Sequence, residues 1–166
     1  MPDHKGDFML LRKRAWDIMR DEYASVREDA SMSETIRVLR ESRTKQPDNA
    51  FVLVFSKTDR FVGVVSMWNL VQGIGPCLLK ATATEEAEVD WDKAFSMACR
   101  NCSTIGIKDF LQTDVPILKP NDPMGRVLEI LLDYRRGRAV VEEGGRIIGV
   151  VLLADLFREI GDYMDM

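Results

Sequence analysis

Apolar and polar residues follow the same plan in two separate stretches of the chain. In residues 137–157, two short apolar runs flank a polar, glycine-containing connection, which is typical of a β-hairpin. The second run passes into residues 153–164, where apolar side chains recur at helical spacing. Residues 51–71 repeat this order of strand, turn, strand and helix, with Gly63 in the place of Gly149. The pattern indicates an internal duplication.

The segments that precede the two hairpins are also related. An extended piece followed by an amphipathic helix begins at Asp17 and again at Asp109, 92 positions later, and the two align without a gap. Ser31 and Glu34 form a capping-box pattern at the first helix, and Asp122 is the predicted N-cap of the second. Each copy is therefore predicted to fold as strand–helix–strand–strand–helix.

The duplication defines the domain organisation that we expect. Residues 1–16 form an N-terminal lead-in, residues 17–75 the first repeat, residues 76–108 a connecting segment, and residues 109–166 the second repeat. A single repeat is too small to bury enough apolar surface for a stable fold of its own. We therefore expect an α/β fold in which two β-α-β-β-α repeats, related by a pseudo-twofold axis, cover each other and enclose a cleft.

The connecting segment has its own pattern. Glycine and proline in residues 73–76 predict the end of the first repeat, and a helix is predicted for residues 91–102. We expect the apolar face of this helix to return to the core. The apolar positions at helical spacing are Trp91, Phe95, Ala98 and Cys102.

Composition and charge narrow the class of protein. The chain is 46% hydrophobic and 30% charged, which is ordinary for a soluble globular protein. No apolar run is long enough to cross a bilayer, and the N-terminus has no signal-peptide layout, so we expect a cytoplasmic protein without membrane contact. A net charge of −4 with mixed signs gives no electrostatic reason to expect a nucleic-acid partner.

Candidate chemical residues are few. The cysteines are Cys77, Cys99 and Cys102, an odd number that fits a reducing compartment better than a disulfide framework. Cys99 and Cys102 form a CxxC, but zinc needs two more ligands and redox CxxC motifs usually follow a strand, so two packed thiols are favoured. With His4 as the only histidine, no Ser-His-Asp or Cys-His set can form. We expect neither an enzyme nor a metal site.

The duplicated unit resembles a tandem pair of CBS domains, named after cystathionine β-synthase, in the arrangement called a Bateman module. The resemblance rests on the paired segments VREDASMSETIRVL and LKPNDPMGRVLEIL, and on a strand glycine followed by a hydroxyl-x-x-carboxylate signature. It covers residues 17–71 and 109–163. It implies a regulatory protein, without a covalent cofactor, that binds AMP, ADP, ATP or S-adenosylmethionine in the cleft between the repeats. It also implies a homodimer and an effector protein.

The resemblance further implies ligand-binding residues. In the signature, an aspartate at the start of the last helix accepts hydrogen bonds from the ribose hydroxyls, and a Ser or Thr three residues earlier contacts ribose or phosphate. The first copy offers Ser66 and Asn69, so an amide replaces the carboxylate. The second offers Leu152 and Asp155, so leucine replaces the hydroxyl. The two sites are incomplete in complementary ways, and Asp155 is favoured.

Residues near the middle strands extend the predicted site. Arg136 and Arg138, together with Arg135, precede the middle strand of the second copy, where the family contacts adenosine and phosphate. Pro116, and Ala24 at the same place in the first copy, match a position whose backbone lines the base pocket in the family. Both sets also have simpler explanations, as a solvated loop and as strand entry.

Three functions therefore stay open at this stage. The leading hypothesis is a nucleotide-sensing regulatory module. The alternative is a structural dimerisation or scaffold module with degenerate, empty sites, in which Ser66 is only an N-cap and Asp155 only a first-turn acid. A weaker third hypothesis is a thiol sensor that uses Cys99 and Cys102.

Overall fold

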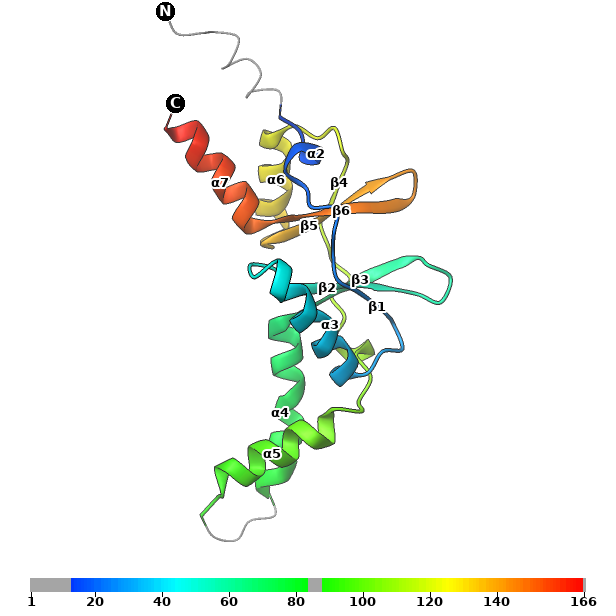
Figure 1. Cartoon of the computed structure of the whole chain (residues 1–166), viewed down its shortest axis with the longest axis vertical. Coiled ribbons are helices and arrows are strands. Elements are labelled where there is room, and N and C mark those ends of the chain that lie inside the picture. Colours follow the sequence, from blue (N-terminus) through cyan, green and yellow to red (C-terminus); the bar gives the residue numbers. More distant parts are fainter. Residues whose placement is uncertain (1–12, 84–87, 166) are drawn as a thin grey trace, which may run out of the picture. The chain divides into compact units, whose positions relative to one another are not determined.

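The computed structural model describes residues 13–83 and 88–165, and their packing forms two compact units (Figure 1). One unit is Ala24–Thr113, and the other combines the chain up to Tyr23 with the chain from Asp114 onward. Most of the predicted lead-in, including His4, lies outside the described residues.

The unit Ala24–Thr113 contains a three-stranded sheet in the order β1-β2-β3. Strand β1 runs parallel to β2, and β2 pairs with β3 as an antiparallel hairpin. After the hairpin, α4 leads away from the sheet and α5 returns beside its far end (Figure 1). The elements are β1 (Ser25–Arg27), α3 (Met32–Lys45), β2 (Phe51–Phe55), β3 (Phe61–Ser66), α4 (Met67–Ala83), α5 (Trp91–Cys102) and the 3-10 helix η1 (Lys108–Phe110).

The other unit has the same topology. Its sheet has the order β4-β5-β6, with a parallel β4–β5 pair and an antiparallel β5–β6 hairpin. The elements around each sheet therefore follow the order strand–helix–strand–strand–helix. The predicted α/β class with two β-α-β-β-α repeats is confirmed. The elements are α2 (Ala15–Ile18), β4 (Ile117–Leu118), α6 (Met124–Tyr134), β5 (Arg138–Glu143), β6 (Arg146–Leu152) and α7 (Leu153–Met164).

Each unit has its own hydrophobic core, because the helices place one apolar stripe against one face of the sheet. In the first-named unit, Met32 of α3 packs with strand residues such as Val54 and Val65. In the other, Val127 of α6 packs with strand residues such as Val141. The two cores keep the ends of β3 and β6, where the predicted ligand residues lie, in fixed positions.

The two sequence repeats exchange the segments that precede their first strands, so that each segment packs against the sheet of the other repeat. Arg20 forms a backbone bridge with Val150 of β6, and Gln112 forms the equivalent bridge with Val64 of β3. Each exchanged segment approaches a strand glycine closely. A Cβ added at Gly149 would lie 2.8 Å from the carbonyl oxygen of Arg20, and one at Gly63 would lie 2.4 Å from that of Gln112. The strand glycines recur because backbone of the chain itself packs against them. The boundaries of the compact units thus differ from those of the sequence repeats, and the repeat boundaries stay a prediction.

Three local expectations are corrected. Helix α4 continues through Gly73 and Pro76 to Ala83 instead of ending there. Gly73 packs closely against the side chains of Met32 and Phe110, which would have to shift to admit a Cβ. The N-cap of α6 is Pro123, not Asp122, because the Asp122 carboxylate accepts a hydrogen bond from the amide of Lys119 instead.

The buried face of α5 also differs from the expected one. Ala94, Ala98 and Cys102 are buried, whereas Trp91 and Phe95 are 63% and 65% exposed. Small side chains let α5 approach α4 closely, and the large aromatic side chains are left on the outside. None of the helices that the structure describes is long and apolar enough to cross a membrane.

Candidate functional site

The favoured site residue, Asp155, lies in the first turn of α7 and is buried. Arg20 binds its carboxylate as a fork: Nε donates to Oδ2 and Nη2 donates to Oδ1, each at 2.9 Å. The guanidinium of Arg158 also approaches Oδ1, at 3.4 Å. The Asp155 side chain is 8% exposed and that of Arg20 is 20% exposed, so the pair is largely shielded from water. The carboxylate that the signature predicts for a ribose already has an internal partner.

The equivalent residues of the other unit form a closed hydrogen-bonded ring. The Ser66 hydroxyl donates to Asn69 Oδ1 at 2.7 Å, and the Ser66 amide donates to the same oxygen at 3.0 Å. The Asn69 amide donates back to Ser66 Oγ at 3.1 Å. This is a reciprocal cap at the start of α4. Both groups that the signature assigns to a ligand are engaged in holding the helix end.

The two sites are related position by position. The offset of 92 residues that relates Asp17 to Asp109 also relates Arg20 to Gln112. Arg20 therefore stands to Asp155 as Gln112 stands to Asn69 in the exchanged-segment topology. One unit has an ion pair at these positions, and the other has two neutral residues.

Arg136 and Arg138 lie in the unit that contains Asp155. Arg138 is the first residue of β5 and is paired in register with Leu152, the N-cap of α7. Burial, reinforced by the nearby positive charge of Arg136, lowers the pKa of Arg138. The buried Nε of Arg136 has no hydrogen-bond partner among the described residues. This end of the sheet therefore carries two neighbouring guanidinium groups that an anion would stabilise.

The N-terminus of α7 is open where that of α4 is closed. No side chain caps α7, because Leu152 replaces the hydroxyl residue at the N-cap. The first amide, of Leu153, donates to the carbonyl of Gly137 at 2.9 Å. Later amides of the first turn can face an anion, which helix N-termini favour.

Pro116 and Ala24 occupy equivalent buried positions before the first strands. The Pro116 carbonyl accepts a hydrogen bond from the Val140 amide at 3.0 Å, and the Ala24 carbonyl accepts one from the Leu53 amide at 2.9 Å. Both residues thus start the parallel ladder of their sheet, and a role in lining a base pocket stays a prediction.

Arg20 was not predicted as a site residue from the sequence. Periodicity carries no signal for a pair whose members are 135 positions apart. The internal duplication did contain a usable signal, since Arg20 and Gln112 are equivalent positions and Asp155 and Asn69 are equivalent positions.

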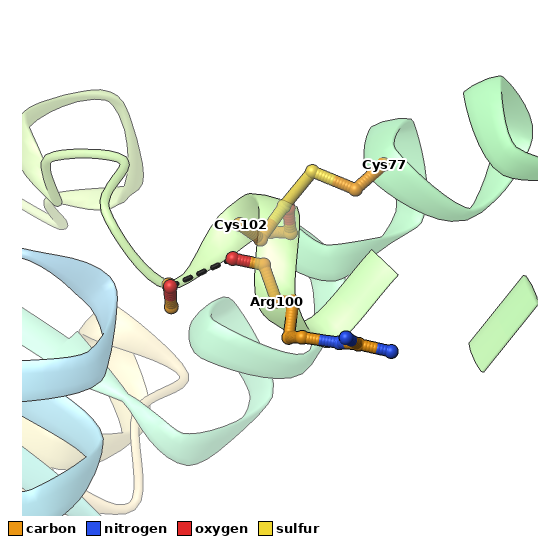
Figure 2. The surroundings of a disulfide bond; sticks show 5 residues. Cys77, Arg100 and Cys102 are labelled. Carbon is orange, nitrogen blue, oxygen red and sulfur yellow. Dashed lines mark hydrogen bonds between the residues drawn. A yellow bond between two sulfur atoms is a disulfide. The ribbon is translucent and has the colours of Figure 1, made fainter. Parts of the chain in front are cut away.

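Two of the three cysteines form a disulfide. Figure 2 shows the bond between Cys77 of α4 and Cys102 of α5, with the Arg100 side chain directed away from it. The Cα atoms are 6.2 Å apart, and Cys99 is free and exposed. The expectation of packed thiols at Cys99 and Cys102 is therefore wrong: the α4–α5 approach brings Cys77, not Cys99, against Cys102.

Comparison with protein families matches residues 15–75 and 107–162 to a profile described as CBS domain. Comparison with curated proteins finds no match. A CBS domain-containing protein of unknown function from Kribbella flavida superposes with a TM-score of 0.66 at 14% identity, over 90% of this chain and 98% of that one. A CBS-domain containing protein from Agrobacterium tumefaciens gives 0.63 at 18% identity, over 90% and 95%.

A further similar structure is the cytosolic domain of the Mg²⁺ channel MgtE in complex with ATP. It superposes with a TM-score of 0.61 at 20% identity, over 95% of this chain. The chain spans about half of that structure, 54% of its length. At such identities these structures show the fold alone.

Proposed function

Because the chain belongs to the CBS domain family, as a tandem pair, we propose that it is a regulatory module for an adenosine-containing nucleotide. The ligand class is AMP, ADP, ATP or S-adenosylmethionine. CBS domains are generally regulatory rather than catalytic, and the similar MgtE domain was solved with ATP. Binding would favour one conformation of the module over another and thereby change its affinity for a partner protein.

The observation that carries this proposal is the buried Nε of Arg136, which lies close to a second guanidinium group, that of Arg138. Burial, and then the nearby positive charge of Arg136, lower the pKa of Arg138. The Nε of Arg136 is buried without a partner in the described chain. A phosphate would supply both the charge and the acceptor oxygens. The first repeat has Ala50 and Val52 at the equivalent positions, so the second repeat is the proposed binding repeat.

Asp155 is the proposed ribose acceptor. Each of its oxygens accepts one hydrogen bond from Arg20, and each keeps lone-pair capacity for a hydroxyl. The uncapped start of α7 lies beside it and favours an anion. Ser66 and Asn69 are a weaker proposal, because they bond to one another.

A scaffold with empty sites is the second candidate function. The polar side chains of both signatures already have internal partners, in the Arg20–Asp155 and Ser66–Asn69 pairs. Homodimerisation, a ligand position between the repeats and a cytoplasmic location stay predictions under either function.

Isothermal titration with ATP, ADP, AMP, S-adenosylmethionine and adenosine tests the proposal. We expect Arg136→Gln to weaken ATP binding about tenfold or more, the loss of a hydrogen bond to a charged group, and to leave adenosine binding unchanged. Asp155→Asn should weaken the binding of adenosine as well as that of ATP. Arg146→Gln, an exposed arginine of β6, is the matched control and should bind as the wild type does.

The opposite result is equally definite. If none of these compounds binds, and none is released when the purified protein is denatured, the sensing function is wrong and the scaffold function is favoured. If ATP binds but Arg136→Gln and Asp155→Asn have no effect, the proposed site is wrong.

A further inference from the structure

A groove of about 610 Å³ lies between α3, α4 and α5, within the unit Ala24–Thr113. Its walls are mainly apolar, with Ile36 from α3, Ile74 and Leu78 from α4, and Phe95 from α5. None of the residues that the nucleotide proposal uses lines it. The groove depends on α5, which lies in the connecting segment between the two repeats.

The rim of the groove is positively charged. Arg37 and Arg40 of α3 line it, three positions apart and therefore on one face of the helix. Neither guanidinium group has a hydrogen bond or ion pair with another residue of the described chain. The lining contains no acidic side chain. Any occupant that brings carboxylates to this rim gains ion pairs at no cost to existing ones.

The apolar surface continues beyond the groove. Val71 on α4 and Phe95 on α5 line the groove yet are 56% and 65% exposed. Trp91, one helical turn before Phe95, is 63% exposed. A small amphipathic anion would fill the groove and leave Trp91, which lies outside the lining, in water. A polypeptide would cover Trp91 as well, and exposed aromatic side chains are typical anchors of protein interfaces.

The walls of the groove are fixed in advance. The Cys77–Cys102 disulfide joins α4 to α5, two of the three helices that line the groove. A pre-organised surface loses less conformational entropy on binding. This favours a docking surface over a loose pair of helices.

We propose that this groove binds an amphipathic helix of a partner protein, with acidic residues beside an apolar stripe. The apolar stripe, spaced i, i+3, i+4, i+7, packs between α3, α4 and α5. The acidic residues pair with Arg37 and Arg40. The inference is independent of the nucleotide proposal and would give the module a surface through which it contacts an effector.

Cys99 provides the test, because it lines the groove and is the only cysteine outside the disulfide. Two designed helical peptides are used, identical in their leucine stripe and flanked by glutamate in one and by lysine in the other. We expect the acidic peptide to slow alkylation of Cys99 by iodoacetamide, followed by mass spectrometry. In calorimetry it should bind about tenfold more tightly than the basic peptide.

Charge reversal at the rim makes the test specific. The double variant Arg37→Glu/Arg40→Glu should invert the preference, so that the basic peptide binds more tightly. The matched control Lys57→Glu/Arg60→Glu makes the same charge change in the exposed β2–β3 turn and should leave the preference as in the wild type.

Several results would overturn the proposal. Equal binding of the two peptides, or binding of neither, excludes an acidic helix as the occupant. Protection of Cys99 by oleate but not by the acidic peptide assigns the groove to small amphipathic anions. Sedimentation that shows a wild-type dimer dissociating in Arg37→Glu/Arg40→Glu, without peptide binding, assigns it to a second copy of this chain.

Discussion

Arg20 holds Asp155 by two parallel hydrogen bonds of 2.9 Å, although 135 positions separate the two residues in the sequence. The fork geometry matches the planar guanidinium to both carboxylate oxygens. Backbone bonds between Arg20 and Val150 flank it, at 2.8 and 2.9 Å. The pair therefore fastens the segment before Tyr23 to the sheet and to the first turn of α7.

Removal of either partner should destabilise the protein. Arg20→Gln leaves a carboxylate that is 8% exposed with only the longer contact to Arg158, and we expect the free energy of unfolding to fall by about 3 kcal/mol. Asp155→Asn should cost a similar amount. The double variant recreates the neutral residue types at Gln112 and Asn69, so it should lose clearly less than the sum. Urea denaturation of the four proteins measures this, and additive losses would show that the fork contributes no coupling.

The close backbone approach at Gly63 predicts a second effect. A Cβ there would lie 2.4 Å from the carbonyl oxygen of Gln112, so Gly63→Ala must break the bridge between Val64 and Gln112. We expect a loss of about 2–3 kcal/mol in the free energy of unfolding. Gly161→Ala is the control: nothing lies within 4 Å of a Cβ in that part of α7, and alanine should stabilise the helix by about 0.5–1 kcal/mol. Thermal denaturation of both variants checks the pair, and equal effects would contradict the packing.

Hydrophobic periodicity was sufficient for the repeated architecture. Each hairpin combines β-branched runs with a polar turn, and each helix buries one stripe, so local sequence and tertiary packing favour the same structure. The duplication added information that one copy alone lacks. It identified Gly63 with Gly149, and the structure shows both under an exchanged backbone segment.

What the sequence could not predict depends on contacts between distant residues. The exchanged segments, the Arg20–Asp155 pair and the choice of Cys77 as the partner of Cys102 all arise from tertiary packing. Helix α4 passes Pro76 because that residue and Gln72, whose carbonyl loses its helical partner, are exposed to water. For the candidate site, residue types could be assigned by resemblance, but their internal partners could not.

The disulfide should contribute substantially to stability. Cys77 and Cys102 close a loop of 25 positions, for which the chain-entropy estimate is about 3.5 kcal/mol. We expect Cys77→Ser/Cys102→Ser, or reduction with dithiothreitol, to lower the free energy of unfolding by about this amount. Urea denaturation with and without reductant measures it.

Cys99→Ser is the control for this prediction, because Cys99 is exposed and outside the bond. It should keep both the wild-type stability and the response to dithiothreitol. A loss of the reductant response in Cys99→Ser would instead favour the thiol-sensor function, in which Cys99 exchanges with the disulfide.

Lys13 and Glu159 form an ion pair at 2.8 Å in which the carboxylate is far more buried than the ammonium, with side chains 10% and 31% exposed. The hydrogen bond to Glu159 raises the pKa of Lys13 above its ordinary value of 10.5. Burial, and then the charge of Glu159, raise the pKa of nearby Tyr163 above 10.0. Both groups hold their protons more tightly in the folded protein than in the unfolded chain.

These two shifts have the same sign and predict loss of stability in alkali. The contribution of a group whose pKa is raised by folding is complete below the unfolded pKa and is lost as pH rises through the folded pKa. The free energy of unfolding should therefore be constant near pH 8–9 and fall above pH 10. In Lys13→Met, the free energy of unfolding should be about 1 kcal/mol lower at pH 8 and should decline less steeply above pH 10. Tyr163→Phe should remove the part of the decline that is due to the tyrosine. Urea denaturation at a series of pH values tests this, and an unchanged slope in the double variant would place the alkaline transition elsewhere in the chain.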